Sequence, residues 1–469
     1  MVKVPNKFSH LEINKELQYA LDAIVERKEN VILIGRAGSG KSELINILKD
    51  VMSSSTVLLA PTGIAAVNIG GATIHSFFKF PPALLDVSKY YRRENVPEEV
   101  LQKLSIVKTI IIDEITMVRS DMMNAIDQCL RWAKVQKGRS KSLLPFGGVQ
   151  MVLVGDTYQL PPVVKSIQQN ARTTYGYASE EQDERSYLEN MFGGVQFFKN
   201  NNFSDGSVCK WTKIKLSKVY RQPDKEFSDI LNRIREGIHT IEDLEIINSR
   251  VMSINDFQSE ISEKLNIFDV GVYLSPFNKV VDTYNSSELS KLPGRYLTYD
   301  AKKSHSDLSM KNFLVPEKLI LKPFAKVMFL RNTESFCNGD IGIFKEETRD
   351  GHLVCEIEEK GEIIVPKFKF EEFEYKIKNN VLEKVSKSFV EQYPLKLAYA
   401  FTIHKSQGKT FETGYCDIGG SFGYHMVYVA LSRFRHLHKL ALKKPIKEKD
   451  IMICNEVKKF METFDSSID

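Results

Sequence analysis

Short apolar runs alternate with segments of helical spacing through the first half of the chain. The runs occupy residues 31–34, 56–59, 109–112 and 149–154, and each ends in a loop rich in polar residues or glycine. Continuous apolar strands of this length are typical of a parallel sheet buried on both faces, which binds ligands at the carboxyl ends of its strands. The pattern predicts an α/β fold.

The second half begins with a similar alternation near Phe227 and then changes character. Before it, a strand is expected at residues 213–216; within it we expect a strand at 270–274 and shorter ones at 326–330, 341–344, 353–357 and 362–365. Asp350-Gly351 and Lys360-Gly361 have the composition of hairpin turns. These signals predict a small antiparallel β-barrel inserted into a second α/β domain. Residues 397–402 then return to a buried strand, and 427–431 begin a further element.

Composition places broad limits on the protein. Its 469 residues are enough for about two to four domains, and 42% hydrophobic with 27% charged residues suits a globular protein. The net charge of +5 is only a weak indication of a polyanionic partner. The six cysteines form no C-x-x-C pair, and no apolar run is long enough for a signal peptide or a membrane span. A soluble, cytoplasmic protein is therefore expected.

A glycine-rich segment follows the first apolar run. It reads Gly35-Arg36-Ala37-Gly38-Ser39-Gly40-Lys41-Ser42 and leads into helical apolar spacing. A strand, a glycine-rich turn and a helix form the context of a phosphate-binding loop, in which backbone N–H groups surround the anion. We expect Gly38, Ser39 and Gly40 to bind a nucleoside triphosphate, Lys41 to reach its β- and γ-phosphates, and Ser42 to ligate Mg²⁺. The alternative is a surface turn that matches by chance.

Two acidic residues end the apolar run at 109–112. Asp113 is expected to hold Mg²⁺, and Glu114 to orient and deprotonate the attacking water. An acidic pair at a strand end could equally well cap the next helix when it is considered alone. Its position after a phosphate-binding loop in the same predicted sheet favours a hydrolytic centre.

Three further residues complete the predicted hydrolytic chemistry. Gln159 lies in the segment 155–162, where its amide can sense a γ-phosphate. Arg221 and Arg433 lie later in the chain, and a guanidinium stabilises the charge that accumulates on a transferring phosphoryl group. For each arginine the alternative is a surface salt bridge. An arginine from a second domain would make hydrolysis depend on cleft closure.

Hydrogen-bond donors gather in loops of both halves. These loops contain Pro61-Thr62-Gly63, Thr73, His75, His404, Ser406 and Gln407. Such loops suit phosphate oxygens and sugars, and aromatic rings beside them can stack on unpaired bases. For Phe77 and Phe78 core packing is the competing explanation, and for at least one of them it is favoured.

As an ordered set these segments resemble the petite-integration-frequency (Pif) family of superfamily 1 DNA helicases. The matching segments are 35–42, 60–66, 73–77, 112–117, 155–162, 220–222, 404–408 and 428–433. Residues 126–150 also look like the family's signature region between its second and third helicase motifs. The resemblance covers nearly the whole chain.

The resemblance implies two RecA-like P-loop domains with ATP and Mg²⁺ in the cleft between them. It places the first at residues 1–223, with a strand-separating wedge near 79–104, and the second at 224–469, with the barrel near 300–390. It implies movement 5′ to 3′ on single-stranded DNA and unwinding of the duplex ahead. The ATPase roles then fall to Lys41, Ser42, Asp113, Glu114, Gln159, Arg221 and Arg433, and the DNA contacts to Pro61, Thr62, Gly63, Thr73, His75, His404, Ser406 and Gln407.

Three positions depart from the family's pattern. The glutamine that reads adenine in the family aligns with Leu17, so we assign that role to the adjacent Gln18. His425 and its neighbours stand where the family usually has a Gly-Gln pair, and Thr116 replaces the more usual serine.

His425, His436 and His438 lack the spacing of a metal site, so solvated or capping histidines are expected.

Other functions are weighed against this one. A GTPase switch would need an N-K-x-D element to read guanine, and the nearest candidate, residues 278–281, lacks the acid. A DNA-binding module with a vestigial ATP site is disfavoured because every expected catalytic residue type is present. A helicase of the RecD family would share the polarity, but residues 126–150 favour the Pif family.

The expected partners are single-stranded DNA and junctions between single- and double-stranded DNA. A monomer is expected, with a dimer on DNA as the alternative. The resemblance implies a role in DNA replication, repair, recombination or telomere maintenance. The compact chain favours a bacterial or phage protein associated with the nucleoid. Forks, displacement loops, RNA–DNA hybrids and four-stranded guanine structures all stay open as substrates.

Overall fold

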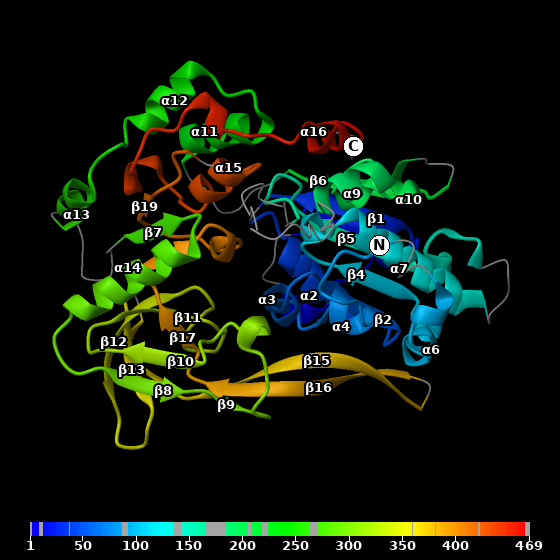
Figure 1. The fold of residues 1–469 in the computed structure, drawn as a ribbon, viewed down its shortest axis with the longest axis horizontal. Coiled ribbons are helices and arrows are strands. Elements are labelled where there is room, and N and C mark those ends of the chain that lie inside the picture. Colours follow the sequence, from blue (N-terminus) through cyan, green and yellow to red (C-terminus); the bar gives the residue numbers. More distant parts are fainter. Residues whose placement is uncertain are drawn as a thin grey trace, which may run out of the picture.

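The structure is a computed structural model with two parallel sheets, one in each half of the chain (Figure 1). It describes residues 2–8, 13–36, 38–86, 92–135, 142–162, 164, 184–204, 208–217, 224–262, 271–358, 360–379, 381–420 and 423–464. Within these residues no helix is long and apolar enough to cross a membrane. The predicted α/β class is confirmed.

A six-stranded parallel sheet forms the centre of the first half, in the order β3-β2-β4-β5-β1-β6. Its strands are β1 (Asn30–Gly35), β2 (Thr56–Ala60), β3 (Ala72–Thr73), β4 (Thr109–Ile112), β5 (Gln150–Gly155) and β6 (Trp211–Leu216). The register sets Leu33 of β1 opposite Val154 of β5 and Ile214 of β6. All four apolar runs predicted in this half are strands of the sheet.

Helices cover both faces of this sheet. Leu33 and Val152 share one hydrophobic cluster with α1 (Lys15–Leu21), α2 (Lys41–Val51) and α3 (Gly63–Asn68). Ile32 and Leu153, which point the other way, share a second cluster with α4 (Ile74–Phe78), α6 (Glu98–Ile106) and α7 (Ser120–Lys134). Two more helices of this half are α9 (Glu184–Phe192) and α10 (Asn201–Ser204). Because both faces are buried, the strands are continuous apolar runs in the sequence.

A four-stranded parallel sheet, β18-β7-β19-β20, forms the centre of the second half. Its strands are β7 (Val272–Ser275), β18 (Ala400–Thr402), β19 (Gly414–Cys416) and β20 (Leu440–Leu442). Tyr273 and Tyr415 pack with α13 (Ile254–Ser262) and α14 (Asn278–Lys291). Leu274 and Cys416 belong to the cluster that contains α11 (Lys225–Glu236) and α15 (Met426–Leu431). The remaining helix before β7 is α12 (Ile241–Asn248).

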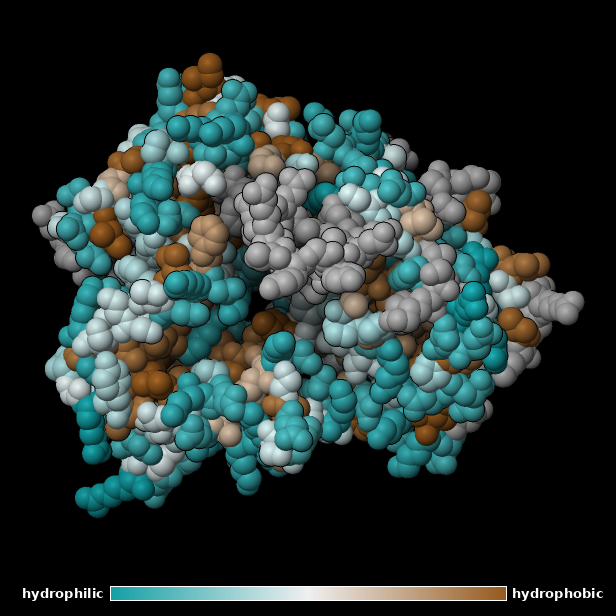
Figure 2. Space-filling view, viewed as in Figure 1, coloured by the Kyte–Doolittle hydropathy of each residue, from teal (hydrophilic) through white to brown (hydrophobic). Residues whose placement is uncertain are grey.

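Antiparallel strands separate α14 from β18, in the region for which a barrel is predicted. A five-stranded sheet has the order β14-β13-β12-β11-β17, β8 pairs with β10, and β16 lies between β15 and β9. The strands are β8 (Leu297–Asp300), β9 (Lys302–Lys303), β10 (Lys318–Leu321), β11 (Lys326–Phe329), β12 (Ile341–Glu347), β13 (Leu353–Ile357), β14 (Gly361–Val365), β15 (Phe368–Lys378), β16 (Val381–Gln392) and β17 (Leu395–Leu397). The space-filling view shows a mainly hydrophilic surface, with hydrophobic residues visible over these strands at lower left (Figure 2).

The single strand predicted at residues 397–402 is wrong, because the chain changes sheets there. β17 ends at Leu397 and pairs with β11, whereas β18 begins at Ala400 and pairs with β7. Between them, the Ala398 N–H donates to the Lys326 carbonyl at 3.0 Å. The apolar run marks burial in both sheets, but it does not show the point at which the chain passes between them.

A long hairpin, β15–β16, reaches from the antiparallel region to the first half and runs beneath it in Figure 1. The Tyr375 hydroxyl accepts a hydrogen bond from the Leu58 N–H at 3.1 Å, and Lys384 Nζ donates to the Gly70 carbonyl at 2.7 Å. The Tyr375 ring also meets Phe77 edge-on, with centroids 5.5 Å apart. Phe77 and Phe78 are both buried, which confirms core packing for them.

The last helix, α16 (Asn455–Met461), returns to the first half after β20 and lies beside α9 and β6 in Figure 1. Phe460 stacks on Phe198 with ring centroids 4.1 Å apart, and Glu456 pairs with Lys199 at 2.7 Å. The chain therefore crosses between the two sheets once more near its described end.

Replacing Phe460 by Ala is expected to release α16 from the first half. Loss of a buried aromatic ring costs about 3–5 kcal/mol, more than a seven-residue helix can recover alone. We expect a lower Tm and rapid tryptic cleavage at Lys458 and Lys459. Ile241→Ala, at a side chain that is 78% exposed, is the control and should change stability by less than about 0.5 kcal/mol. Unchanged protease resistance of Phe460→Ala would contradict this account of the docking.

Candidate active site

The strand order brings three polar strand ends together. β4, β5 and β1 are neighbours in the first sheet and run in the same direction. Their carboxyl ends lead into Asp113-Glu114, Asp156 and the glycine-rich loop, respectively. Residues that are far apart in the sequence therefore meet at one edge of the sheet, as predicted for a ligand site of this fold.

The glycine-rich loop connects β1 to α2. Gly38 and Gly40 have φ angles of 79° and 93°, which are strained for residues with a side chain. A Cβ at Gly35 would lie 2.3 Å from Ser39 Oγ. Ser39 Oγ is buried and has no hydrogen-bond partner among the described residues, and Ala37 lies outside them. The predicted order of strand, turn and helix is present, with Ser42 exposed in the first turn of α2.

Lys41 folds back over this loop. Its Nζ donates to the carbonyls of Gly35 at 2.6 Å and of Arg36 at 2.7 Å. Burial lowers the pKa of Lys41, and the charges of Asp156, Glu114 and Asp113 oppose that shift. The ammonium group is thus held within the field of all three carboxylates.

The acidic pair at the end of β4 has perturbed ionisation. Burial raises the pKa of Glu114 to about 7, the carboxylate of Asp113 adds to the rise, and the charges of Lys41 and Arg433 oppose it. Burial also raises the pKa of Asp113. Glu114 adopts a left-handed φ of 49°, which is uncommon for residues other than glycine and is typical of functional sites. A carboxyl group with a pKa near neutrality suits a general base.

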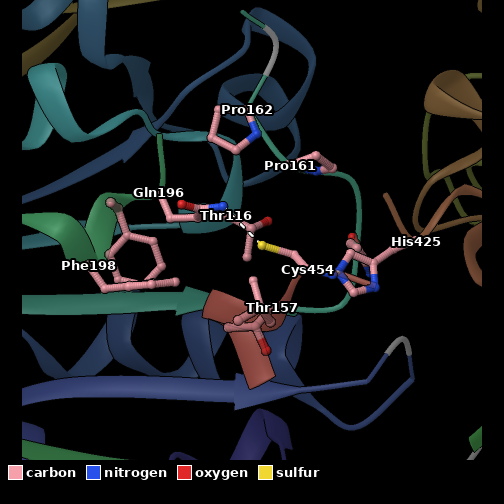
Figure 3. Close-up of a pocket in the computed structure, with 11 residues that line it drawn as sticks. Thr116, Thr157, Pro161, Pro162, Gln196, Phe198, His425 and Cys454 are labelled. Atoms are coloured by element: carbon pink, nitrogen blue, oxygen red, sulfur yellow. Dashed lines mark hydrogen bonds between the residues drawn. The ribbon is translucent and has the colours of Figure 1, made fainter. Parts of the chain in front are cut away.

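The loop after β5 holds Gln159 beside Asp156. Gln159 is buried, its Nε2 donates to Asp156 Oδ2 at 3.4 Å, and its Oε1 has no hydrogen-bond partner among the described residues. Figure 3 shows a pocket at this loop, lined by Thr116, Thr157 and the prolines from the first half and by His425 and Cys454 from the end of the chain. A hydrogen bond from Gln196 Nε2 to Cys454 Sγ, 3.2 Å long, closes one side of it.

Of the two predicted arginines, the structure describes one. Arg433 is 1% exposed, and its Nη1 donates to the carbonyls of Ser406 at 3.3 Å and of Lys409 at 3.2 Å. The charge of Arg433, which belongs to the second half, lowers the pKa of Glu114 in the first half. Arg221 lies outside the described residues.

Gln18 and Leu17 lie on different sides of α1. Gln18 Nε2 donates to the Val2 carbonyl at 3.3 Å and to Asp22 Oδ1 at 3.0 Å. Leu17 is buried against the glycine-rich loop, since a Cβ at Gly40 would lie 3.4 Å from its Cδ1. In this arrangement Gln18 holds the N-terminal segment, and Leu17 packs against the loop.

The predicted DNA-binding residues of the first half lie at helix starts. Thr62 caps α3 and Thr73 caps α4, each accepting a backbone N–H with its hydroxyl. Burial lowers the pKa of His75, which is in the first turn of α4. A Cβ at Gly63 would lie 2.8 Å from Asn312 Cα, so a segment of the second half covers the start of α3. Pro61 immediately precedes this cap.

The corresponding residues of the second half follow β18. His404 is exposed, whereas Ser406 is buried and its hydroxyl donates to the Ile403 carbonyl at 2.7 Å. Gln407 Nε2 is buried without a hydrogen-bond partner among the described residues. The loop backbone at Ser406 is also the acceptor for Arg433.

Sequence reasoning missed a lysine beside this loop. Burial lowers the pKa of Lys396 to about 7, and the charges of Lys409 and Lys405 lower it further. Burial also lowers the pKa of Lys409, to about 8. Lys396 lies on β17, with its Nζ 4.7 Å from the centre of the Phe401 ring. The spacing in the sequence carries no signal for this cluster, because it forms where the chain changes sheets.

Comparison with known proteins gives the family. A family model described as PIF1-like helicase matches residues 12–244. Over 440 residues the chain is 30% identical to the ATP-dependent DNA helicase Pif1 of Bdellovibrio bacteriovorus, an alignment that covers 92% of this chain and 88% of that protein. The chain belongs to the PIF1-like helicase family. The family predicted from the ordered motifs is confirmed.

Two solved structures of Bacteroides Pif1 resemble this PIF1-like chain to different degrees. The complex with ADP-AlF4 is 28% identical, covers 97% of both chains and has a TM-score of 0.82. The structure bound to single-stranded DNA is 29% identical, covers 96% of this chain and 97% of that one, and has a TM-score of 0.62. The present arrangement resembles the ADP-AlF4 form more closely.

Proposed function

We propose that this PIF1-like chain is an ATP-dependent DNA helicase that moves 5′ to 3′ on single-stranded DNA and unwinds duplex or structured DNA. One observation carries the proposal. The glycine-rich loop and Glu114 lie at the same edge of the first sheet, and the charge of Arg433, from the other half, lowers the pKa of Glu114. A nucleotide bound at that edge would contact both halves. The names of the relatives support the same activity.

Each proposed catalytic role follows from position and chemistry. The N–H groups of Gly38, Ser39 and Gly40 bind the phosphates, and Lys41 turns from the loop carbonyls to the γ-phosphate. Ser42 and Asp113 supply the oxygen donors that suit Mg²⁺, which neutralises charge on the phosphates when it is bound. Glu114 accepts the proton of the attacking water, and Gln159 senses the γ-phosphate.

We infer that hydrolysis is coupled to movement of the two halves. Arg433, and Arg221 by its motif, stabilise the charge on the γ-phosphate only when the cleft is closed. Loss of that phosphate removes the contact, so the cleft reopens. If the DNA contacts at 61–75 and 404–407 alternate in grip, each cycle moves the strand by an inchworm mechanism. The covering of Gly63 by Asn312 fits an arrangement without DNA.

The remaining assignments are part of the same proposal. Residues 1–223 and 224–469 are the two RecA-like domains, with the wedge near 79–104 and the β-barrel near 300–390. Gln18 stays the proposed reader of adenine. The partners are single-stranded DNA and its junctions with duplex DNA, and the protein acts as a monomer, or as a dimer on DNA, in the bacterial cytoplasm or nucleoid.

ATP hydrolysis measured with and without a single-stranded oligonucleotide tests the function. We expect strong stimulation by DNA, and unwinding of a duplex with a 5′ tail but not of one with a 3′ tail. Lys41→Ala should abolish hydrolysis while DNA binding persists, because Lys41 lies at the glycine-rich loop and is not one of the proposed DNA contacts. Hydrolysis that is indifferent to DNA would reject the motor, and hydrolysis by Lys41→Ala would reject the site.

The raised pKa of Glu114 predicts the pH dependence of hydrolysis. A carboxyl with a pKa of about 7 is protonated below that pH and then accepts no proton. The kcat/KM for ATP should therefore rise by about tenfold per pH unit up to about pH 7 and level off above it. The measurement is made without DNA, so that titration of Lys396 does not contribute. Glu114→Gln should be nearly inactive and should not show this rise. A flat profile between pH 5.5 and 7 would remove Glu114 as the base.

The lysine cluster predicts a contact with the DNA backbone. At pH 6, where the Lys396 ammonium is charged, Lys396→Gln should weaken binding of single-stranded DNA and reduce the slope of log affinity against log salt concentration by about 0.7, because one fewer counterion is released. Fluorescence anisotropy at several salt concentrations measures both. Lys449→Gln, at an exposed lysine near the C-terminus, is the control and should leave the slope unchanged. An unchanged slope for Lys396→Gln would contradict the contact.

A further inference from the structure

A fully buried arginine of the second half reaches into the candidate ATPase site. Arg235 lies near the end of α11 and is 1% exposed. Its Nη2 donates to Asp156 Oδ1 at 3.2 Å, and Asp156, directly after β5, is also 1% exposed. The ion pair therefore joins the two halves of the chain beside the glycine-rich loop. Arg235 lies outside all of the motif segments by which the chain resembles the helicase family.

Two tyrosine rings from different halves hold the guanidinium. Its carbon lies 4.3 Å from the ring centre of Tyr158, in the loop after β5, and 5.9 Å from that of Tyr428, on α15. Arg235 Nε is buried and has no hydrogen-bond partner among the described residues. Among the described residues, the guanidinium therefore donates one hydrogen bond, which crosses the interface to the carboxylate of Asp156.

The Asp156 carboxylate accepts from two side chains, one on each oxygen, and its Oδ1 also accepts from the Tyr158 backbone N–H at 3.3 Å. Oδ1 accepts from Arg235, and Oδ2 accepts from Nε2 of Gln159, the proposed sensor of the γ-phosphate, at 3.4 Å. The Asp156 carboxylate also acts electrostatically on Lys41 and Glu114. Any rotation of Gln159 toward a phosphate removes one donor from this carboxylate and leaves Arg235 as its remaining side-chain donor.

Burial of such a pair is poor evidence for a purely stabilising role. Removing two charges from water costs several kcal/mol per ion, and apolar side chains of similar volume often serve stability equally well. A charged pair differs from an apolar contact because it responds to a change in the donors of its carboxylate. The pair lies between Gln159 and α15, which carries Tyr428. A change at Gln159 can therefore affect the second half through this pair.

We propose that Arg235 is a positioning residue that transmits the position of Gln159 to the second half of the chain through the carboxylate of Asp156. The inference rests on the proposed function, since it concerns how the ATPase site and DNA binding are coupled. Arg235 itself does not contact the reacting atoms. Its effect is on the degree to which DNA accelerates hydrolysis.

The test compares Arg235→Met, Arg235→Lys and a control on the same helix. Arg233→Met is matched to the first, because Arg233 lies two residues away and pairs with Asp243 inside the second half. The kcat and the KM for ATP are measured for each variant with and without a saturating single-stranded oligonucleotide. Arg235→Met should lower the ratio of stimulated to unstimulated kcat by about tenfold, within the usual range of coupling between sites.

The other variants separate coupling from stability. Arg235→Lys should recover a large part of the ratio, and Arg233→Met should keep the ratio of the unaltered protein even if its Tm falls. Asp156→Asn, alone and combined with Arg235→Met, should give the same loss, because one interaction is removed in each case. If Arg235→Met does not fold, Asp156→Asn carries the test.

A normal stimulation ratio in folded Arg235→Met, or an equal fall of both rates together with the Tm, would overturn the proposal. If Arg235→Met is unfolded, a normal ratio in Asp156→Asn would overturn it in the same way. Absence of stimulation in the unaltered protein would instead reject the proposed helicase function, so the two failures are distinguishable.

Discussion

The adjacency of β4, β5 and β1 is the constraint on which the rest of the site depends. It forces Asp113, Glu114 and Asp156 into one small volume with Lys41, at the edge where the glycine-rich loop turns into α2. Burial disfavours the charged form of Glu114, and repulsion by the neighbouring carboxylates adds to that cost, so the pKa of Glu114 rises to about 7. Positive charges from Lys41 and from the second half reduce the repulsion. Chemistry at this edge is therefore sensitive to where the second half lies.

The sequence was sufficient for the features that are local. The predicted strands of the first sheet are present because a short, continuous apolar run is typical of a parallel strand buried on both faces. The polar residues at the strand ends follow directly after those runs. Lys396 and Arg235 could not be identified in the same way. Lys396 lies in an apolar stretch that splits between two sheets, and Arg235 lies on an amphipathic helix whose partners come from elsewhere in the chain. The β15–β16 hairpin has an alternating pattern, but nothing local shows that Tyr375 bonds to Leu58.

Three contacts between the halves differ in their physical character. The docking of α16 is apolar, with Phe460 stacked on Phe198, and an apolar contact is indifferent to charge at the ATPase site. The hairpin contact combines a ring packing with two hydrogen bonds to the backbone of the first half. The Arg235–Asp156 pair lies next to the phosphate loop and shares its carboxylate with Gln159. Of these three contacts, the ion pair is the one whose carboxylate also accepts from Gln159, the proposed sensor of the γ-phosphate.

Arg433 illustrates the complementary property, rigidity. Its guanidinium donates to the backbone carbonyls of Ser406 and Lys409, in the loop proposed to grip DNA, and its Nε donates to the carbonyl of Val429 on α15, the helix that ends just before Arg433. These bonds fasten the arginine that acts on Glu114 to the loop that follows β18. A displacement of Arg433 relative to the first sheet therefore displaces that loop by a comparable amount, because the hydrogen bonds and the burial around them leave little independent freedom. On the proposed mechanism, the position of the second half against the first therefore affects Arg433 and this loop together, and the buried pair at Asp156 lies on that boundary.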